Sequence, residues 1–233
     1  MTTLVERFAT LTTPHLADGC IRAGVEVRCA PAALRPVVSG SRFVGPARPV
    51  RHVGSVDLIL EAVERSSPGE VLVVDNEGRV DEACVGDLMV HEANGAGMVG
   101  VLIWGLHRDT VDITEIGLPL VSLGAFPTGP LRLDPRPADA LNVATVGPWT
   151  VTADDLVVAD EDGVLLIPLE RADEVFTLAE GIRDTEVKQA DLIRGGRSLR
   201  EQVGFGAYLK AREANPALTF RDHLRGVGGE IEV

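Results

Sequence analysis

The apolar residues of the first half of the chain follow two spacings in turn. Four of them recur at helical spacing over 56–65 and predict a helix there. Val71-Leu72-Val73-Val74 is a continuous apolar run, which is typical of a strand buried on both faces. The same order then returns, with a helix expected over 86–97, a strand over 98–103, a short helix over 109–116 and a strand over 118–123. This alternation predicts an α/β fold.

The segments on either side of this repeat have a different character. Residues 3–24 are predicted to be helical, with a break at Thr13-Pro14. Residues 41–50 are predicted to be extended, with an interruption at Gly45-Pro46. Beyond the Gly- and Pro-rich segment 124–137, we expect a β-rich face that closes the core, with short strands over 143–146, 149–152, 156–159 and 164–167. A long helix over 170–194 should then stop at Gly195-Gly196.

The length of 233 residues suits one large domain, or a compact core with a terminal addition. We expect the domain to cover residues 1–203. The tail over 204–233 has a mixed pattern and a Gly-rich end. It is interpreted as an arm that packs on a neighbouring subunit or is partly disordered.

Composition and charge narrow the classes of protein. The net charge of −13, with no long Lys/Arg run, disfavours nucleic acid and anionic membranes as partners, since both require a positive field. The N-terminus lacks the apolar region of a signal peptide, and there is no run of 18 apolar residues, so we expect no membrane span and a cytoplasmic location. Cys20, Cys29 and Cys84 lack metal-ligand spacing and are interpreted as small buried hydrophobes rather than disulfide partners.

Candidate chemistry is densest between Gly86 and Asp112. Asp87 stands at the start of a predicted helix, where an acid also simply complements the helix dipole. Twenty residues separate it from Arg108, and the helix and strand between them should carry the chain out and back. Asp87 is therefore expected near the C-terminal end of the 98–103 strand, where α/β sheets form ligand crevices.

The residues after that strand offer complementary charges. Arg108 has a planar guanidinium suited to a carboxylate, and Asp109 offers hard oxygen ligands for Mg²⁺ or Mn²⁺. The alternative is an ordinary Arg–Asp loop in which Asp109 caps a helix. His107 is a candidate base, although packing or support of its neighbours is the more common role, and Trp104 either covers the pocket or is simply buried.

With Asp87, Arg108 and Asp109 at this spacing, the sequence resembles the 4-hydroxy-4-methyl-2-oxoglutarate aldolase family. The RraA-like fold of that family is shared by the regulator of ribonuclease E activity. The pattern of that family is an acid, twenty residues, Arg-Asp, two residues and an acid, matched here by Asp87, Arg108, Asp109 and Asp112. The likeness also covers three further blocks in the same order: 44–47, 68–75 and 155–164. It implies a layered α/β sandwich with a swivelling β/β/α-type core, assembled as a homotrimer or a dimer of trimers with sites between subunits.

The resemblance also implies a role for each matching residue. Arg108 would bind the pyruvyl carboxylate or the enolate oxygen, and Asp109 would ligate Mg²⁺, Mn²⁺ or another divalent metal. The backbone of Gly86, Leu88 and Met89 at a helix N-terminus would hold the substrate carboxylate. Asp87 would contact metal-bound water and assist proton transfer, with Asp112 in the outer shell. Glu186 of a neighbouring subunit, or else Glu180, would complete the site.

The expected reaction is cleavage of a 4-hydroxy-2-oxo acid, such as 4-hydroxy-4-methyl-2-oxoglutarate, to pyruvate. Such a cleavage generates an enolate, which a Schiff-base lysine or a metal must stabilise. The two lysines, Lys188 and Lys210, lie outside the motif, which favours a metal together with Arg108. Decarboxylation of oxaloacetate passes through the same enolate and is expected as a side activity.

Two alternatives stand beside the aldolase. A protein–protein regulator of the ribonuclease E type shares the fold, and fold alone does not separate the two. An S-adenosylmethionine-dependent methyltransferase is disfavoured, because no Gly-rich loop follows an early strand. The sequence departs from the family at Trp104-Gly105, where many members have Asp-Gly, and this puts the particular aldol substrate in doubt.

Overall fold

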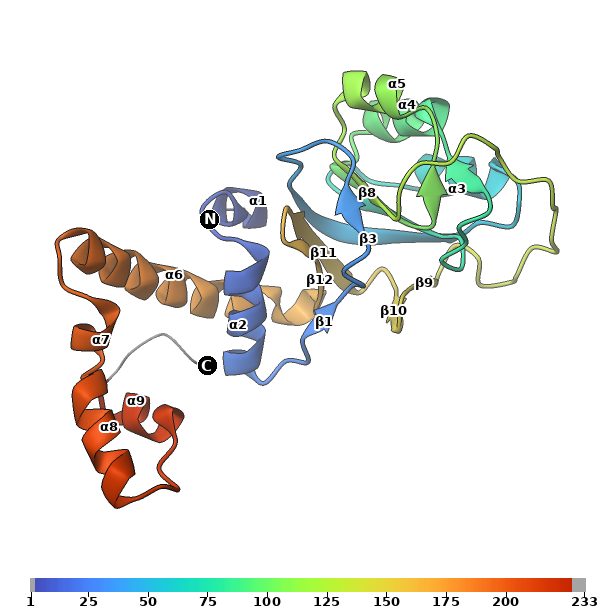
Figure 1. Ribbon diagram of the computed structural model, residues 1–233. Helices are drawn as coiled ribbons and strands as arrows, with labels where there is room; N and C mark the ends of the chain where they lie inside the picture. The colour runs from blue at the N-terminus through green and yellow to red at the C-terminus, as the bar shows by residue number, and fades with distance from the viewer. Residues whose placement is uncertain (1–2, 228–233) are drawn as a thin grey trace.

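The computed structural model describes residues 3–227, and a curled, open eight-stranded sheet organises them (Figure 1). The strands are β1 (Arg28–Cys29), β2 (Arg35–Pro36), β3 (Phe43–Arg51), β4 (Val71–Asp75), β5 (Ala83–Val85), β6 (Gly100–Trp104), β7 (Leu106–His107), β8 (Leu120–Ser122), β9 (Ala144–Val146), β10 (Trp149–Val151), β11 (Asp155–Asp160) and β12 (Gly163–Pro168). The main sheet has the order β1-β12-β11-β3-β4-β6-β8-β2, and β9–β10 and β5–β7 form two small pairs.

The helices follow the predicted alternation. They are α1 (Leu4–Phe8), α2 (Thr13–Ala23), α3 (Asp57–Glu64), α4 (Asp87–Gly95), α5 (Thr110–Ile116), α6 (Ala172–Arg194), α7 (Leu199–Gln202), α8 (Phe205–Ala214) and α9 (Phe220–Val227), with the 3-10 helix η1 (Leu169–Arg171) before α6. The helices expected over 56–65, 86–97, 109–116 and 170–194 are confirmed as α3, α4, α5 and α6. The α/β class is therefore confirmed as well.

Strand β3 joins the two halves of the sheet. Its first residues pair antiparallel with β11, and Ala47–Arg51 pair parallel with β4. The predicted interruption at Gly45-Pro46 was wrong, because the strand runs unbroken through both residues. Pro46 lies where β3 changes partners, so the missing N–H removes no bond from a continuous ladder.

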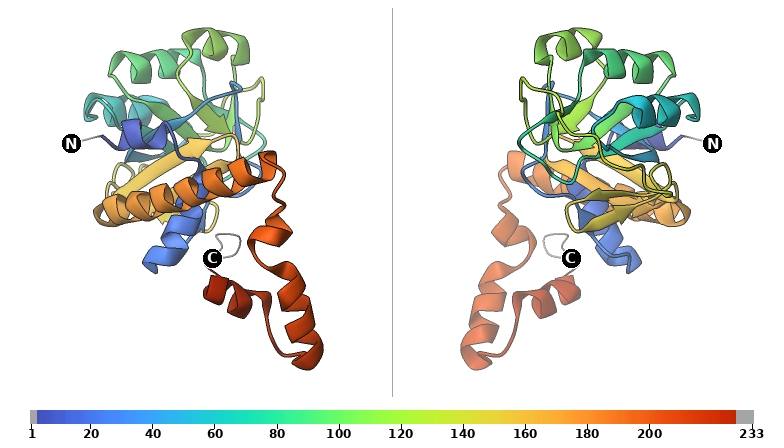
Figure 2. Two further views of the ribbon diagram at one scale, coloured as in Figure 1. Left: turned by 90° about the vertical axis from the view of Figure 1, so that its left-hand side faces the viewer. Right: turned by 90° about the vertical axis from the view of Figure 1, so that its right-hand side faces the viewer.

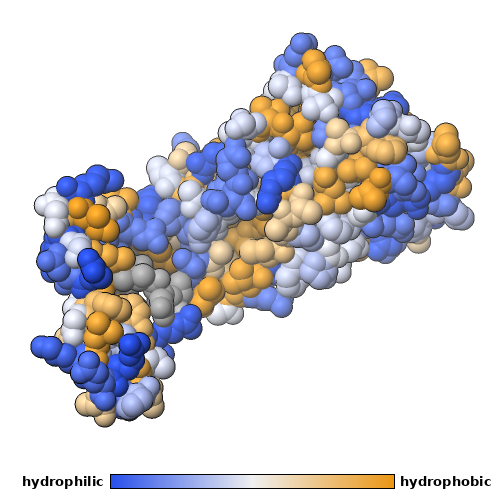
Figure 3. Space-filling view, in the orientation of Figure 1, coloured by the Kyte–Doolittle hydropathy of each residue, from blue (hydrophilic) through white to orange (hydrophobic). Residues whose placement is uncertain are grey.

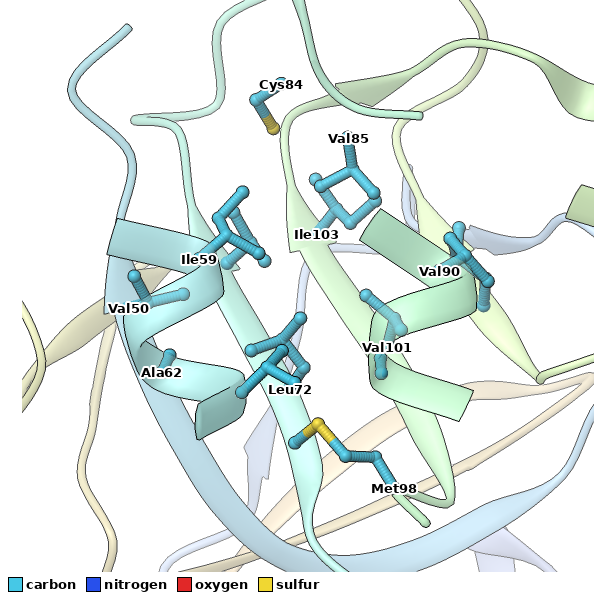
Figure 4. Close-up of a cluster of buried hydrophobic side chains, with 14 of the residues drawn as sticks. Val50, Ile59, Ala62, Leu72, Cys84, Val85, Val90, Met98, Val101 and Ile103 are labelled. Carbon is cyan, nitrogen blue, oxygen red and sulfur yellow. The ribbon is translucent and has the colours of Figure 1, made fainter. Parts of the chain in front are cut away.

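Alternate residues of each strand point to opposite faces, and this divides the core. Leu72 and Val74 face the cluster under α3 and α4 that Figure 4 shows, whereas Val71 and Val73 face the inside of the curl. Helices α1, α2 and α6 cover the other half of the outer face, over β11 and β12. The site-bearing helices α4 and α5 and the long helix α6 therefore belong to different halves of the molecule (Figure 1).

The C-terminal helices α7, α8 and α9 project from the end of α6, away from the sheet (Figures 1 and 2). A ring cluster holds them together, with Phe205 and Phe220 centroids 5.5 Å apart and Tyr208 5.0 Å from Phe220. Figure 3 shows that this arm exposes hydrophobic as well as hydrophilic residues. Packing of the arm on another subunit stays a prediction, and residues 228–233 of its Gly-rich end lie outside the described residues.

The cysteines only partly match their interpretation. Cys20 and Cys84 are buried, as expected of small hydrophobes, but Cys29 is exposed on the edge strand β1. The three thiols are free, so no disulfide joins them. Among residues 3–227, no helix is both long and apolar enough to cross a membrane.

Candidate functional site

The short parallel pair β5–β7 brings the two halves of the Asp87/Arg108 motif together. Val85 is the register partner of His107, and the Arg108 backbone N–H donates to the Val85 carbonyl at 2.9 Å. Gly86 and Asp87 follow β5 directly, while Arg108 and Asp109 follow β7. Asp87 and Arg108, with twenty residues between them in the sequence, therefore stand side by side at the carboxyl ends of two parallel strands.

Asp109 has an unusual backbone. Its φ of 61° and ψ of 43° place it in the left-handed region, which few residues other than glycine adopt. It precedes α5, yet its side chain makes no capping hydrogen bond. Its Oδ2 instead lies 3.3 Å from Nε of Arg108. Asp109 is therefore the N-cap residue of α5 by position, without a side-chain capping bond, and its carboxylate faces the Arg108 side chain.

Two glycines make room for this ion pair. A Cβ on Gly86 would lie 2.5 Å from Oδ2 of Asp109 and 3.2 Å from Nε of Arg108. A Cβ on Gly129 would lie 3.1 Å from Nη1 of Arg108. The guanidinium is thus held between two backbone segments while its side chain stays half exposed. Such packing orients a cation without removing it from solvent.

A cavity of about 260 Å³ opens beside this pair. It is lined by residues of four segments: His52, Val56, Ala83, Cys84, Val85, Gly86, Asp87, Leu88, Met89, Arg108 and Pro130. The N-terminus of α4 belongs to its wall, and Asp87 and Leu88 stand in the first turn, where backbone N–H groups have no partner within the helix. The Met89 N–H already donates to the Gly86 carbonyl at 3.2 Å. Asp87 and Leu88 thus offer the free donors for an anion.

His107 is buried just before this pair and bonds at both ring nitrogens. Its Nδ1 lies 2.8 Å from Oγ of Ser122, and its Nε2 lies 2.9 Å from Oγ1 of Thr110. Hydroxyl groups both donate and accept, so a neutral imidazole satisfies both contacts. Burial lowers the pKa of His107. Through these two hydrogen bonds, His107 links β7 to β8 and to the first residue of α5.

Burial also lowers the pKa of His52, so both histidines are neutral in the folded protein. An unfolded histidine, with a pKa of about 6.5, takes up a proton more readily. Stability from these two groups is therefore complete above about pH 6.5 and is lost as the pH falls below it. We expect the free energy of unfolding in urea to fall from about pH 7 to pH 5, and to fall less steeply for His107→Asn. Equal slopes for the two proteins would contradict this account.

The remaining predicted residues lie elsewhere. Asp112 is exposed in the first turn of α5 and does not line the cavity. Glu186 is on α6, where its Oε2 lies 3.0 Å from Nε2 of His15. Glu180 accepts from Arg7 at 2.7 Å. Neither glutamate is near Arg108 within one chain, because α6 covers the other half of the sheet.

Trp104 lines a second and larger cavity, of about 910 Å³. This cavity lies at the carboxyl ends of three neighbouring strands, where Arg51, Asp75 and Trp104 are in register. The indole lies against Gly78, at which a Cβ would be 2.8 Å from the ring. Trp104 thus shapes this second cavity and does not cover the one at Arg108. His52 lines both.

The donor set suits a hard cation that keeps much of its water. Among residues 3–227, no group of three or more His, Cys, Asp or Glu could hold a metal ion. Asp109 is one-third exposed and has no capping bond, so its oxygens are accessible. Mg²⁺ commonly binds proteins through one or two carboxylates and retains several waters. These residues therefore fit Mg²⁺ or Mn²⁺ and do not fit a fully protein-ligated zinc site.

Gly86 offers a direct test of this geometry. For the pyruvate-forming reaction that the sequence predicts, we expect Gly86→Ala to lower the rate by about 100-fold, because the new methyl group would displace the Asp109 carboxylate by about 1 Å. The backbone φ of −124° is open to alanine, so the melting temperature should change little. Gly95→Ala, at the end of the same helix and in open space, is the control. Normal turnover by Gly86→Ala would show that this contact is unimportant.

Sequence reasoning missed several residues of the cavity. His52 and Val56 follow β3, and Pro130 belongs to the loop between β8 and β9. Gly129 of the same loop does not line the cavity but lies against the Arg108 side chain. The strands β5 and β7 were not predicted either, since two- and three-residue strands carry too short a pattern. The Gly129-Pro130 dipeptide predicts a turn, but nothing in the sequence indicates what the turn contacts.

Comparison with known proteins agrees with the fold. The RraA-like family (Aldolase/RraA) matches residues 13–166, and the chain belongs to this family. A Halalkalibacterium halodurans protein, named for a proposed 4-hydroxy-4-methyl-2-oxoglutarate aldolase activity, is 28% identical over 182 residues, 77% of this chain and 82% of that protein. Protein DlpA of Legionella pneumophila is 24% identical over 208 residues, and the chain spans only 33% of its length.

Solved structures share the architecture. An uncharacterised Pseudomonas syringae protein superposes with a TM-score of 0.73 at 26% identity, covering 84% of this chain and 94% of that one. A Streptomyces coelicolor protein, described as an unusual member of the RNase ES inhibitor RraA protein family, has a TM-score of 0.68 at 27% identity over 78% of this chain and 93% of its own. The family therefore includes both proteins named as aldolases and proteins named as inhibitors of an RNase.

Proposed function

We propose that this protein is a divalent-metal-dependent aldolase that cleaves 4-hydroxy-2-oxo acids to pyruvate, with oxaloacetate decarboxylation as a side activity. The observation that carries the proposal is the placement of Arg108, Asp87 and the N-terminus of α4 around one small cavity, with Asp109 held against Arg108. A cation and free N–H groups suit the carboxylate of a 2-oxo acid. The aldolase names of relatives support the same class.

Each residue has a role in this reaction. Arg108 would bind the 2-oxo acid through its guanidinium and stabilise the negative charge that develops on the ketone oxygen. The N–H groups of Asp87 and Leu88 would hold the carboxylate, and the Asp87 side chain would take the proton from the substrate hydroxyl through water. Asp109 would hold Mg²⁺ or Mn²⁺, which supplies Lewis-acid stabilisation of the enolate when bound.

A Schiff-base mechanism finds no support in the position of the lysines. Lys188 lies on α6 and Lys210 on α8, and neither lines the cavity at Arg108. A lysine aldolase needs its amine beside the substrate ketone. This placement favours charge stabilisation over covalent catalysis.

We further propose that a neighbouring subunit completes the site in a homotrimer or a dimer of trimers. The Glu186 side chain is 44% exposed, and α6 presents it away from the Arg108 cavity of its own chain. Such a glutamate can act only on the site of another copy. Val56 and Leu88 at the cavity are also exposed, as residues beneath a partner would be in the isolated chain.

The test is pyruvate release from oxaloacetate in the presence of Mg²⁺, followed with lactate dehydrogenase. We expect release that EDTA abolishes and added Mg²⁺ restores. The Arg108→Ala variant and an enzyme-free sample correct for the spontaneous reaction of oxaloacetate. The absence of pyruvate from every 2-oxo acid offered would contradict the proposal.

A regulator of an RNase is the second candidate, favoured by the likeness to the Streptomyces coelicolor protein. A pure binding protein does not require Asp87, Arg108 and Asp109 to meet beside a cavity. Tight binding to a ribonuclease, together with no turnover of any 2-oxo acid, would favour the regulator.

A further inference from the structure

The C-terminal arm, residues 197–227, is folded on its own side chains. Besides its ring cluster, Val203 is buried, and Nε2 of His223 lies 2.7 Å from the Val203 carbonyl oxygen. Gln202 joins the arm to α6, because its Nε2 donates to the Gln189 carbonyl at 3.1 Å. The arm therefore keeps its shape while it projects from the end of α6, away from the sheet (Figures 1 and 2).

The arm is basic, although the chain as a whole is strongly acidic. Residues 197–227 contain six Lys or Arg and three Asp or Glu, whereas the net charge of the 233 residues is −13. The cations, all of them exposed, are Arg197, Arg200, Lys210, Arg212, Arg221 and Arg225. Leu192 and Ile193 at the end of α6 and Leu209 on α8 are exposed as well. The arm and the end of α6 thus present cations and apolar groups together.

The opposite charge gathers at the other end of the molecule, where α3, α4 and α5 stand together (Figure 1). The three segments that hold these helices, 56–65, 86–97 and 108–116, are here called the acidic face. Their charged residues are eight acids, Asp57, Glu61, Glu64, Asp87, Glu92, Asp109, Asp112 and Glu115, and two arginines, Arg65 and Arg108. The arginines pair with Glu61 and Asp109, so six acids remain in excess.

The acidic face also exposes large apolar side chains. Val56, Leu60, Leu88 and Val111 are all exposed, Leu88 at 68% and Val111 at 71%. Single exposed apolar residues are ordinary, whereas several of them among charged residues mark an interaction surface. Val56 and Leu88 also line the Arg108 cavity. The acidic face is therefore complementary to the arm in charge, and it borders the candidate active site.

The arm and the acidic face of one chain lie at opposite ends of the molecule, so a second copy must supply the contact (Figure 1). Copies joined through two different surfaces form a closed ring or an open filament. Arg194, the end of α6, comes eight residues after Glu186, which is a length of about 12 Å along a helix. A Glu186 that reaches the cavity of another copy therefore carries the arm to the rim of that cavity.

We infer that the basic arm of each copy docks on the acidic face of the next copy and closes a ring of identical subunits. The cations of the arm meet the excess acids, and the exposed apolar groups of the two surfaces cover one another. The inference rests on the part of the proposed function in which a neighbouring subunit completes the site, and it does not require the aldolase reaction. Docking also brings cations beside a cavity whose lining contains a single Arg or Lys of its own chain, Arg108.

The experiment measures the mass of the full-length protein by light scattering, over a range of protein concentrations in low and high NaCl. One variant reverses the arm, Arg200→Glu with Lys210→Glu, and another reverses the acidic face, Glu64→Lys with Glu92→Lys. We expect each to weaken self-association by about 100-fold or more, because each brings like charges together. High salt should weaken the wild-type assembly in the same direction, since it screens exposed charges.

Two further chains separate docking from an effect on the fold. Asp154→Lys with Asp162→Lys changes the charge as the acidic-face variant does, but at exposed acids outside that face, and should not alter the mass. The chain that carries the arm and acidic-face reversals together should assemble again, because the two surfaces are still opposite in charge. Damage to the folded chain would not be repaired by a second pair of substitutions.

The outcomes that overturn the inference are equally definite. They are a wild-type chain that stays monomeric at every concentration, an arm reversal that leaves the mass unchanged, and no recovery in the combined chain. A monomeric chain whose arm binds RNA would assign the arm to another partner and would also overturn it. An assembly that behaves as expected but forms no pyruvate would leave the docking intact and overturn the proposed reaction.

Discussion

Replacing Arg108 with alanine should lower kcat/KM for pyruvate formation by about 1000-fold without unfolding the protein. The large loss follows from two features: Arg108 is the single arginine or lysine among the residues that line the cavity, and in the proposed reaction it would face the charge that develops on the substrate. We expect little loss of stability because of where the Arg108 side chain lies. Its side chain is half exposed, and its one ion pair, with Asp109, is also exposed, so we expect a change in stability below about 1 kcal/mol.

The matched control is Arg136→Ala. Arg136 has the same exposed fraction, 50%, and a single carboxylate partner in Glu61, but it does not line the cavity. Arg108→Lys adds a second comparison, because it keeps the charge and loses the planar pair of donors. We expect it to recover only a small part of the activity. If Arg108→Ala and Arg136→Ala turn over equally fast, the site lies elsewhere.

The sequence was sufficient for the parts of the fold that depend on long local patterns. The helices α3 and α6 are long local patterns and the buried strand β4 is a continuous apolar run, and each is found within a few residues of its predicted range. Features that depend on tertiary partners were not predictable. The unbroken course of β3 through Pro46 depends on a change of partner strand, which no local pattern encodes.

At the site, too, local patterns were predictable and tertiary contacts were not. The spacing of Asp87 and Arg108 indicated that the two would approach, and β5–β7 explains how they do. The left-handed backbone of Asp109 and the space left by Gly86 are visible only in three dimensions. Of the two roles expected for Trp104, it does not cover the Arg108 cavity, because a residue four positions before Arg108 in the chain can face a different strand end; it is partly buried and lines the larger cavity. Glu186 contacts His15 within its own chain, and a role at the site of another subunit cannot be deduced from a single chain.

Asp109→Asn isolates the proposed metal ligand with little disturbance of the backbone. Asparagine tolerates the left-handed conformation that Asp109 adopts, so the turn should be retained. The variant loses the negative charge that would hold Mg²⁺, while Arg108 remains to bind the substrate carboxylate. We therefore expect pyruvate formation from oxaloacetate to fall by about 100-fold or more at a fixed Mg²⁺ concentration.

We expect Asp109→Asn to weaken metal binding but not substrate binding, and this difference is what the experiment measures. In calorimetric titrations, Asp109→Asn should bind Mn²⁺ more weakly by at least about tenfold, since second-shell changes alone already cost 10- to 100-fold in affinity. Pyruvate binding in EDTA should be nearly unchanged, because it depends on Arg108 and the N-terminus of α4. Glu115→Gln removes an exposed acid from α5, the helix that Asp109 precedes, and should alter neither the Mn²⁺ affinity nor the pyruvate affinity. If Asp109→Asn kept normal Mn²⁺ affinity and turnover, Asp109 would be only the partner that orients Arg108, and the metal would have to be held by other residues.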